Sequence, residues 1–223
     1  DIKRGDIRVT FFAFSPLRSG VTDFGASFSG GGVARVGQRT AFGWLPAGVN
    51  SSPRISDVAS GIRNMALEII ILAAGMGKRM QSDLPKVLHP IGGKPMLQHL
   101  IDNTRQVNAA RIHIVIGTGG EQVRSALAAD DINWVIQSEQ LGTGHAALQA
   151  LPACDPANDV LILLGDVPLV QSGTMRSLLD LGADLALLTV RVPDPTGYGR
   201  ITRADNGTVR SIVEQGDVTE QEN

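Results

Sequence analysis

The stretch of sequence that decides the fold is LEIIILAAGMG, residues 67–77. Its first seven residues are apolar apart from Glu68 and rich in β-branched isoleucine, which is typical of a strand buried on both faces of a parallel sheet. Small residues and glycines follow at once and end the strand. The stretch therefore predicts a buried strand that leads into a loop, where glycines let backbone N–H groups approach a ligand closely.

Strands and helices alternate through the rest of the chain. The expected strands are residues 67–73, 111–116, 133–137, 159–164, 184–192, 199–203 and 208–213, and the expected helices are residues 95–108, 120–129, 143–151 and 172–181, with a loop over residues 74–94. Strands that alternate with helices of about ten residues predict βαβ units. We therefore expect a Rossmann-like α/β fold with a mostly parallel sheet and helices on both faces.

The composition of the whole chain excludes several classes of protein. The 223 residues carry 20 basic and 22 acidic side chains, for a net charge of −2, which argues against a nucleic-acid partner. Hydrophobic residues make up 43% of the chain, enough for a packed core. No apolar run approaches the roughly 20 residues of a membrane-spanning helix. The single cysteine, Cys154, excludes an intramolecular disulfide and a multi-cysteine metal site.

The composition changes at Met65. All six Phe precede this residue and all five Met lie from it onward, while residues 1–64 carry a net charge of +4 and the remainder −6. Residues 1–64 could be a low-order or artefactual extension, a targeting segment, or a small Gly-rich domain. We predict the first, because only residues 9–14 show a strand-like pattern there. The predicted folded domain is residues 65–223.

Polar and glycine residues follow three of the expected strands. In open parallel sheets, ligands bind at the carboxyl ends of the strands, so these residues should face one crevice. They are Ala74, Gly75 and Gly77 after the first strand, Gln137, Gln140, Gly142 and Thr143 at the end of the third, and Gly165 and Asp166 after the fourth.

Three cations near the first of these loops point to a phosphate ligand. Lys78, Arg79 and Lys86 lie in a domain that is otherwise acidic. The loop is not a Walker A motif, because neither Gly-Lys pair is followed by Ser or Thr. The alternative is a tight turn with solvated charges.

Asp166 and three other polar residues could contact such a ligand. A carboxylate at the tip of a buried strand suits Mg²⁺, with phosphate oxygens completing its shell, although Asp166 could equally be a turn or cap residue. Gln137 and Gln140 could read a base edge or make ordinary loop hydrogen bonds. Glu214 could bind a sugar hydroxyl or be a polar surface residue. The residues alone predict an α/β domain that binds a phosphate-bearing ligand, with Mg²⁺ as the candidate metal.

Four motifs, at residues 72–89, 137–146, 165–169 and 194–201, resemble the sugar-1-phosphate nucleotidyltransferases. Within them the chain is most similar to the uridyltransferase domain of the bacterial bifunctional N-acetylglucosamine-1-phosphate uridyltransferase/glucosamine-1-phosphate acetyltransferases. The resemblance runs from Met65 to about Asp217. It implies Mg²⁺-dependent transfer of a uridylyl group from UTP to N-acetylglucosamine 1-phosphate, giving UDP-N-acetylglucosamine and pyrophosphate.

The resemblance also implies a setting and a set of residue roles. The setting is a cytoplasmic enzyme that supplies precursors of peptidoglycan and lipopolysaccharide and so supports cell shape. Arg79, Lys86 and Asp166 match the catalytic residues, Asp166 being the Mg²⁺ ligand. The substrate-binding positions are Leu72, Ala73, Ala74, Gly75, Lys86, Gln137, Gly142, Thr143, Leu164, Gly165, Asp166, Gly199 and Glu214.

The sequence departs from this family pattern in three ways. Leu164 stands where relatives often carry Tyr, and Gly216 where they often carry Lys. The chain stops at Asn223, before two family Asn residues and the acetyltransferase domain, so we expect a sheet incomplete at the C-terminus and a monomer. The alternatives are a catalytically silent nucleotide-binding fragment and a nucleotidyltransferase with another base or sugar specificity.

Overall fold

The computed structural model describes residues 6–14, 33–34, 66–75, 77, 80–117, 120–181, 185–191, 193–194, 196, 198–205 and 209–213. For residues 6–14 and 33–34 it describes the course of the backbone alone.

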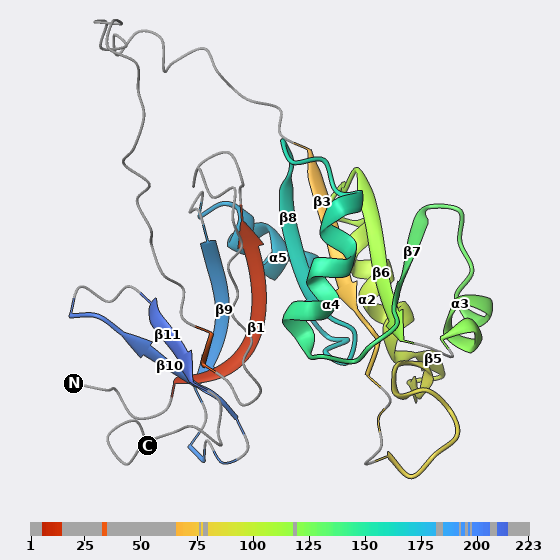
Figure 1. The fold of residues 1–223 in the computed structure, drawn as a ribbon, viewed down its shortest axis with the longest axis horizontal. Helices are drawn as coiled ribbons and strands as arrows, with labels where there is room; N and C mark the ends of the chain where they lie inside the picture. Colours follow the sequence, from red (N-terminus) through yellow and green to blue (C-terminus); the bar gives the residue numbers. More distant parts are fainter. Residues whose placement is uncertain are drawn as a thin grey trace, which may run out of the picture.

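Four parallel strands form the centre of the sheet. They lie side by side in the order β8 (Asp159–Leu164), β3 (Leu67–Leu72), β6 (Arg111–Gly117) and β7 (Ile132–Gln137) (Figure 1). The register sets Leu72, at the end of β3, opposite Val115 on one side and Leu164 on the other. The prediction of a parallel α/β sheet is confirmed, and so is the position of each of these strands to within a residue or two.

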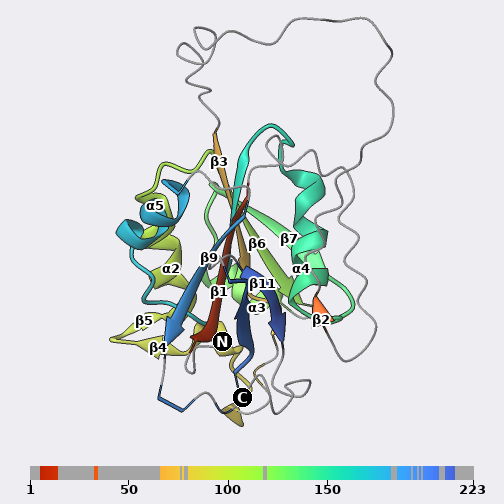
Figure 2. The ribbon, with the colours of Figure 1, turned by 90° about the vertical axis from the view of Figure 1, so that its left-hand side faces the viewer.

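Helices cover both faces of this parallel sheet. On one side lie α2 (Met96–Arg105) and α5 (Ser172–Leu179), and on the other lies α4 (Thr143–Ala150) (Figure 2). Side chains of β3 alternate between the two layers: Ile69 and Ile71 pack into the core cluster of α2 and α5, whereas Ile70 packs into that of α4. All three are fully buried, which explains why β3 has an unbroken apolar sequence.

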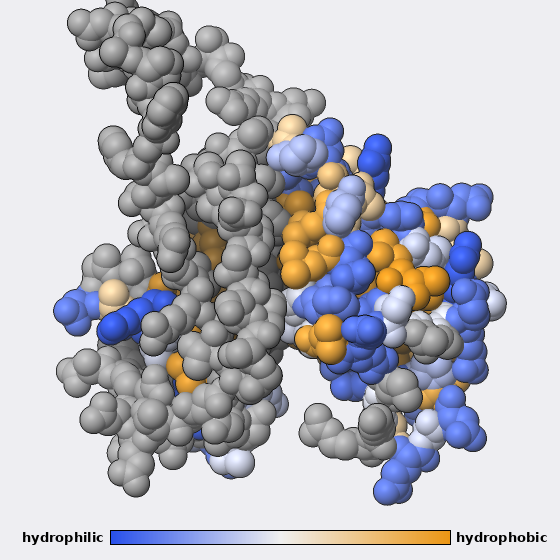
Figure 3. Space-filling model, viewed as in Figure 1, coloured by the Kyte–Doolittle hydropathy of each residue, from blue (hydrophilic) through white to orange (hydrophobic). Residues whose placement is uncertain are grey.

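The face of the molecule on which α4 lies is mixed in character. On the face in front of the parallel strands, apolar residues lie among hydrophilic ones (Figure 3). Leu148 on α4 and Ile136 on β7 are among the exposed large apolar residues. In the part of the chain that the structure describes, every helix falls short of the length and apolar content that a membrane crossing requires.

An antiparallel region extends the sheet beyond β8. It contains the three expected late strands, which are β9 (Leu185–Arg191), β10 (Arg200–Arg203) and β11 (Val209–Val213). β1 (Asp6–Phe14) pairs antiparallel with β8, β9 and β10, and β2 (Val33–Ala34) pairs with β11. The two described pieces of residues 1–64 therefore lie in the same sheet as later strands, and the division of the chain at Met65 stays a prediction.

The segment expected as a loop, residues 74–94, contains short regular elements. A 3₁₀ turn, η3 (Lys86–Leu88), is followed by a small hairpin of β4 (Pro90–Ile91) and β5 (Lys94–Pro95). Elsewhere α3 (Glu121–Ala126) is shorter than expected, η4 (Leu151–Ala153) follows α4, and α2 ends three residues early. Strands of two residues that include proline lack the alternating apolar pattern by which strands are predicted.

Candidate functional site

The loops after β3, β6 and β8 begin side by side at the carboxyl ends of the parallel strands. Ala73 N–H donates to Val115 O at 2.8 Å, and Gly165 N–H donates to Leu72 O at 2.9 Å. These bonds tie the end of β3 to the ends of both neighbouring strands. The residues that follow β3 and β8 are thus brought together, as the parallel arrangement predicts, and Gln140, in the loop after β7, reaches the same place through its bond to Ala74 O.

Lys86 and Asp166 form an ion pair at these strand ends. Lys86 lies on η3 and Asp166 follows β8, and Lys86 Nζ is 2.7 Å from Asp166 Oδ2. The two side chains are 34% and 40% exposed. A pair this exposed contributes about 0–1 kcal/mol to stability, so stability alone gives little reason for its presence. The pair instead places a cation and a carboxylate together where a charged ligand can reach both.

Gly77 brings the loop after β3 close to Lys86. A Cβ on Gly77 would lie 2.7 Å from Lys86 Cβ, and its φ of +59° lies in the left-handed region. Both features require glycine there. Lys78, Arg79 and Glu214 lie outside the described residues, so the roles expected of Arg79 and Glu214 stay predictions.

Gln137 holds the turn that starts α4. The side chain is 2% exposed, and its Nε2 donates to Gly142 O at 3.2 Å and contacts His145 Nδ1 at 3.0 Å. Thr143, the first residue of α4, is exposed beside this turn. The amide nitrogen of Gln137 is therefore used within the chain, which is the loop hydrogen bonding that the sequence left open as an alternative to base reading.

His145 is part of this arrangement, although the spacing of the histidines in the sequence matches no metal-ligand motif. Its Nε2 lies 3.1 Å from Gln149 Nε2, so the imidazole ring is held between two glutamine side chains. The sequence did hold a signal for this contact, because His145 lies in the first turn of the helix that follows the Gln137 strand.

The other predicted residues take up separate places. Leu164 is the half-buried last residue of β8, and Gly165 behind it is buried. Gly199 comes directly before β10, in the antiparallel region rather than at the ends of the parallel strands. Gln140 extends from the loop after β7 to the loop after β3, where its Nε2 donates to Ala74 O at 2.8 Å.

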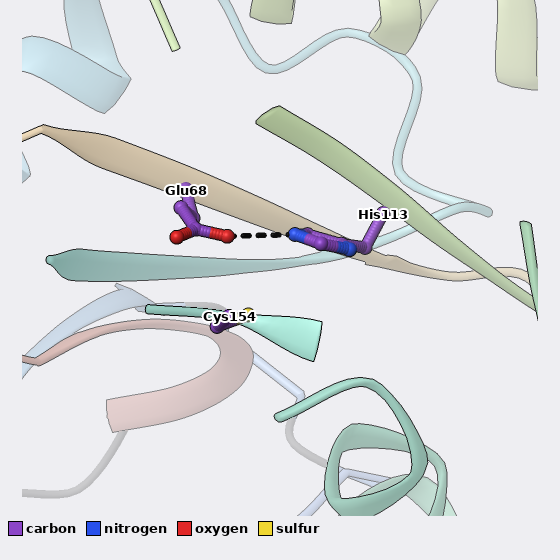
Figure 4. A group of neighbouring side chains, drawn as sticks. All are labelled: Glu68, His113 and Cys154. Carbon is purple, nitrogen blue, oxygen red and sulfur yellow. Dashed lines mark hydrogen bonds and ion pairs between the residues drawn. The ribbon is translucent and has the colours of Figure 1, made fainter. Parts of the chain in front are cut away.

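A second cluster of polar side chains lies toward the amino ends of the strands. His113 Nε2 is 2.8 Å from Glu68 Oε2, and both side chains are 1% exposed (Figure 4). Glu68 Oε1 accepts bonds from Asp155 N–H at 2.7 Å and from Asn158 Nδ2 at 2.8 Å. The far ring nitrogen, His113 Nδ1, lies 2.9 Å from Asn133 Nδ2.

This cluster is a satisfied hydrogen-bond network rather than a metal centre. Its ligand-type atoms, from Glu68, His113 and Cys154, lie within 4.8 Å of one another. Both carboxylate oxygens and both ring nitrogens are already bonded. Burial, assisted by the nearby Glu68 carboxylate, raises the pKa of Cys154 to about 12, so the thiol stays protonated and is a poor ligand.

The charge of Glu68 is stabilised by its partners. Burial alone acts to raise the pKa of its carboxyl group, but bonds from Asp155 N–H, Asn158 and His113 outweigh burial, and the pKa lies below the ordinary value of 4.5. The ionised Glu68 carboxylate accepts a hydrogen bond from His113 Nε2–H, which leaves His113 Nδ1 to accept a hydrogen bond from Asn133 Nδ2. Sequence reasoning missed this network, and its one signal was a charged residue inside an apolar strand.

The sequence is similar to known nucleotidyltransferases. The model of the MobA-like NTP transferase domain family matches residues 69–204. A protein named Bifunctional protein GlmU from Pseudomonas aeruginosa is 61% identical over 157 residues, which cover 70% of this chain and 34% of that protein. One of the same name from Cupriavidus pinatubonensis is 53% identical over 156 residues, covering 69% and 34%. The chain thus spans about a third of the length of these relatives.

Two solved structures share the fold. HddC from Yersinia pseudotuberculosis aligns with a TM-score of 0.52 at 23% identity, over 66% of this chain and 69% of that one. A glucose-1-phosphate thymidylyltransferase-type protein from Bacillus anthracis aligns with a TM-score of 0.55 at 22% identity, over 67% and 65%. At these identities the similarity shows the α/β fold alone.

Proposed function

Because the chain belongs to the MobA-like NTP transferase domain family, we propose that it transfers a uridylyl group from UTP to N-acetylglucosamine 1-phosphate. The products are UDP-N-acetylglucosamine and pyrophosphate. The choice of uridine and amino sugar rests on the four sequence motifs. The observation that carries the proposal is the Lys86–Asp166 pair beside the glycine loop after β3.

The reaction needs charge neutralisation more than covalent chemistry. A phosphate oxygen of the sugar phosphate forms a bond to the α-phosphorus of UTP, and the bond from that phosphorus to the bridging oxygen of the β-phosphate breaks. Pyrophosphate leaves with the electron pair. In this proposal Lys86 neutralises phosphate charge, Arg79 supplies a second cation, and the loop of residues 72–75 lies along the nucleotide.

Asp166 fits the role of a Mg²⁺ ligand. Its carboxylate is partly exposed at the end of β8, and the Lys86 bond occupies Oδ2 alone. Carboxylate oxygens are the ligands that Mg²⁺ prefers in proteins, and the ion usually keeps phosphate oxygens and waters as its other ligands. A bound Mg²⁺ would supply positive charge next to the reacting phosphates. Lys86 can then turn from Asp166 to the phosphates, since its side chain is flexible and partly exposed.

The remaining proposed contacts specify the uridine and the sugar. Gly142 and Thr143, which are exposed at the turn after β7, are proposed to contact the uracil side of the nucleotide, and Gln137 is proposed to hold that turn in place through its bond to Gly142 O. Leu164 and Gly165 end β8 beside Asp166, and Gly199 and Glu214 are proposed sugar contacts.

Nucleotide selectivity in binding tests the proposal. Isothermal titration with UTP, CTP and dTTP, each with Mg²⁺, should show that UTP binds most tightly and that chelating the metal weakens the binding. Equal affinities would contradict uridine specificity. Tighter binding of CTP or dTTP would assign the chain to a different base.

A further inference from the structure

The loop after β7 is connected to the loop after β3 by one side chain. Gln140 Nε2 donates to Ala74 O at 2.8 Å, and the two residues are 66 positions apart in the sequence. We propose that Gln140 is a positioning residue, which fixes the Ala74–Gly75 peptide so that the Gly75 N–H faces the ligand phosphates. The inference rests on the proposed function, because it concerns how the chain presents a donor to the nucleotide.

Gly117 shows that the structure leaves room for this contact. It is the last residue of β6, which lies between β3 and β7 in the sheet. A Cβ on Gly117 would lie 2.8 Å from Gln140 Nε2 and 2.9 Å from Ala74 O. Any residue larger than glycine would push both groups of the hydrogen bond. The bond therefore passes directly over the end of β6.

The direction of the Ala74 carbonyl fixes the direction of the Gly75 N–H. The described part of the chain contains no cis peptide bond, so the C=O and N–H of the Ala74–Gly75 peptide point in opposite directions. The carbonyl points toward β6 and β7, where Gln140 binds it. The N–H consequently points to the other side of β3, where β8 ends at Gly165 and Asp166 follows.

The space around Gly75 suits a ligand at this N–H. Apart from the chain neighbours of Gly75, no atom of the described residues would lie within 4 Å of a Cβ built on it, and the residue is exposed. A backbone N–H held in advance of binding stabilises phosphate charge without the cost of ordering it during the reaction. Gln140 thus acts on the phosphates through the peptide, without touching them.

The same contact argues against a role for Gln140 in recognising the base. Its amide nitrogen is bonded to Ala74 O, so Gln140 can offer a donor to a base edge only if it releases that carbonyl. Substitutions at Gln140 should therefore change phosphate affinity and leave base preference as it is.

Two variants of the full 223-residue chain break the contact from opposite sides. Gln140→Glu keeps the size of the side chain and removes the donor, whereas Gly117→Ala adds a methyl group against both partners. We expect each to weaken binding of Mg²⁺-UTP by about tenfold, the usual scale for one bond to a charged group. Uridine affinity and the ratio of UTP to CTP affinity should change less than about twofold. Gln98→Glu is the matched control, because it removes a similar donor from Asp102 on α2.

A parallel loss of UTP and uridine affinity, or a changed base ratio, would overturn the inference in favour of base reading. An independent measurement covers the case in which the chain fails to bind UTP at all. In the unliganded protein, ¹⁵N relaxation of the Gly75 amide should show greater mobility in both variants than in the parent chain and in Gln98→Glu. Unchanged Gly75 mobility would overturn the positioning role, while failure of the parent chain to bind UTP would count against the proposed function alone.

Discussion

Lys86 Nζ lies 2.7 Å from Asp166 Oδ2, although the two residues are 80 positions apart and belong to different βαβ segments. The pair joins a cation and a carboxylate at the carboxyl edge of the parallel strands. Each member of such a pair can replace the other with a ligand of opposite charge, Lys86 with a phosphate and Asp166 with a metal ion. This relationship leads to separate expectations for the two residues.

Asp166→Asn should lower turnover by about a hundredfold or more, in line with the loss of one electrostatic contact in an active site. The carboxylate that holds the metal is removed while the shape of the side chain is kept. Pyrophosphate release measured over a range of Mg²⁺ concentrations checks this. Asp102→Asn is the matched control: Lys94 and Asp102 also lie 2.7 Å apart and partly exposed, and turnover there should not change. Full activity of Asp166→Asn would exclude the assigned role.

Lys86→Ala should weaken UTP binding much more than uridine binding. Two unit charges about 4 Å apart interact by about 4 kcal/mol at an effective dielectric constant near 20, so even a screened contact is worth about tenfold or more in affinity. Lys86→Arg should recover part of the loss, since it keeps the charge. Titration calorimetry with the two ligands gives the comparison. If uridine and UTP lose affinity equally, Lys86 does not act on phosphates.

The Glu68–His113 pair predicts an acid-sensitive component of stability. The pKa of Glu68 in the fold lies below 4.5, so its stabilising effect is present above that pH and is lost as the pH falls through the lowered pKa. In Glu68→Gln, the free energy of unfolding should be about 1–3 kcal/mol lower at pH 7 and should vary less with pH in the acid range. Urea unfolding from pH 7 down to pH 3.5 measures both effects. An unchanged pH profile would mean that Glu68 is not ionised in the fold.

Cys154 should behave as a structural thiol rather than a metal ligand. Since its pKa is raised to about 12, little thiolate is present near neutral pH. Alkylation by iodoacetamide at pH 8 should be slow, and Cys154→Ser should not change turnover. Co²⁺ titration provides the opposing test, because a thiolate–metal absorption band would show that Glu68, His113 and Cys154 do bind an ion.

The division at Met65 predicts that residues 65–223 unfold cooperatively on their own. Residues after Met65 pack into two core clusters, one on each face of the parallel sheet. We expect the shortened chain to keep a single thermal transition and its affinity for UTP. Loss of a cooperative transition would instead show that β1, which pairs with β8 and β9, is a necessary strand of the domain.

Sequence reasoning predicts the parallel half of the fold well. β3 and β8 are buried on both faces, so nearly every residue in them is apolar and the pattern is unambiguous. The hairpin of β4 and β5 is missed because each of its strands is two residues long and includes a proline. The place of β1 between β8 and β9 is missed because pairing partners far apart leave no local signal.

The sequence predicts which residues belong to the candidate site, but not which of them are in contact. The strand-end rule places Lys86 and Asp166 in one region, but their ion pair depends on the path of residues 74–94. The bonds of Gln140 to Ala74 O and of Glu68 to His113 follow from strand order and register. Neither can be derived from composition or spacing along one chain.

The most direct test of the account is product formation by the 223-residue chain with Mg²⁺, UTP and N-acetylglucosamine 1-phosphate. The account predicts equal amounts of pyrophosphate and UDP-N-acetylglucosamine, dependent on both substrates and reduced about a hundredfold or more in Asp166→Asn. Folded protein that binds UTP and releases no pyrophosphate would contradict it, and would make the chain a nucleotide-binding protein without transfer activity.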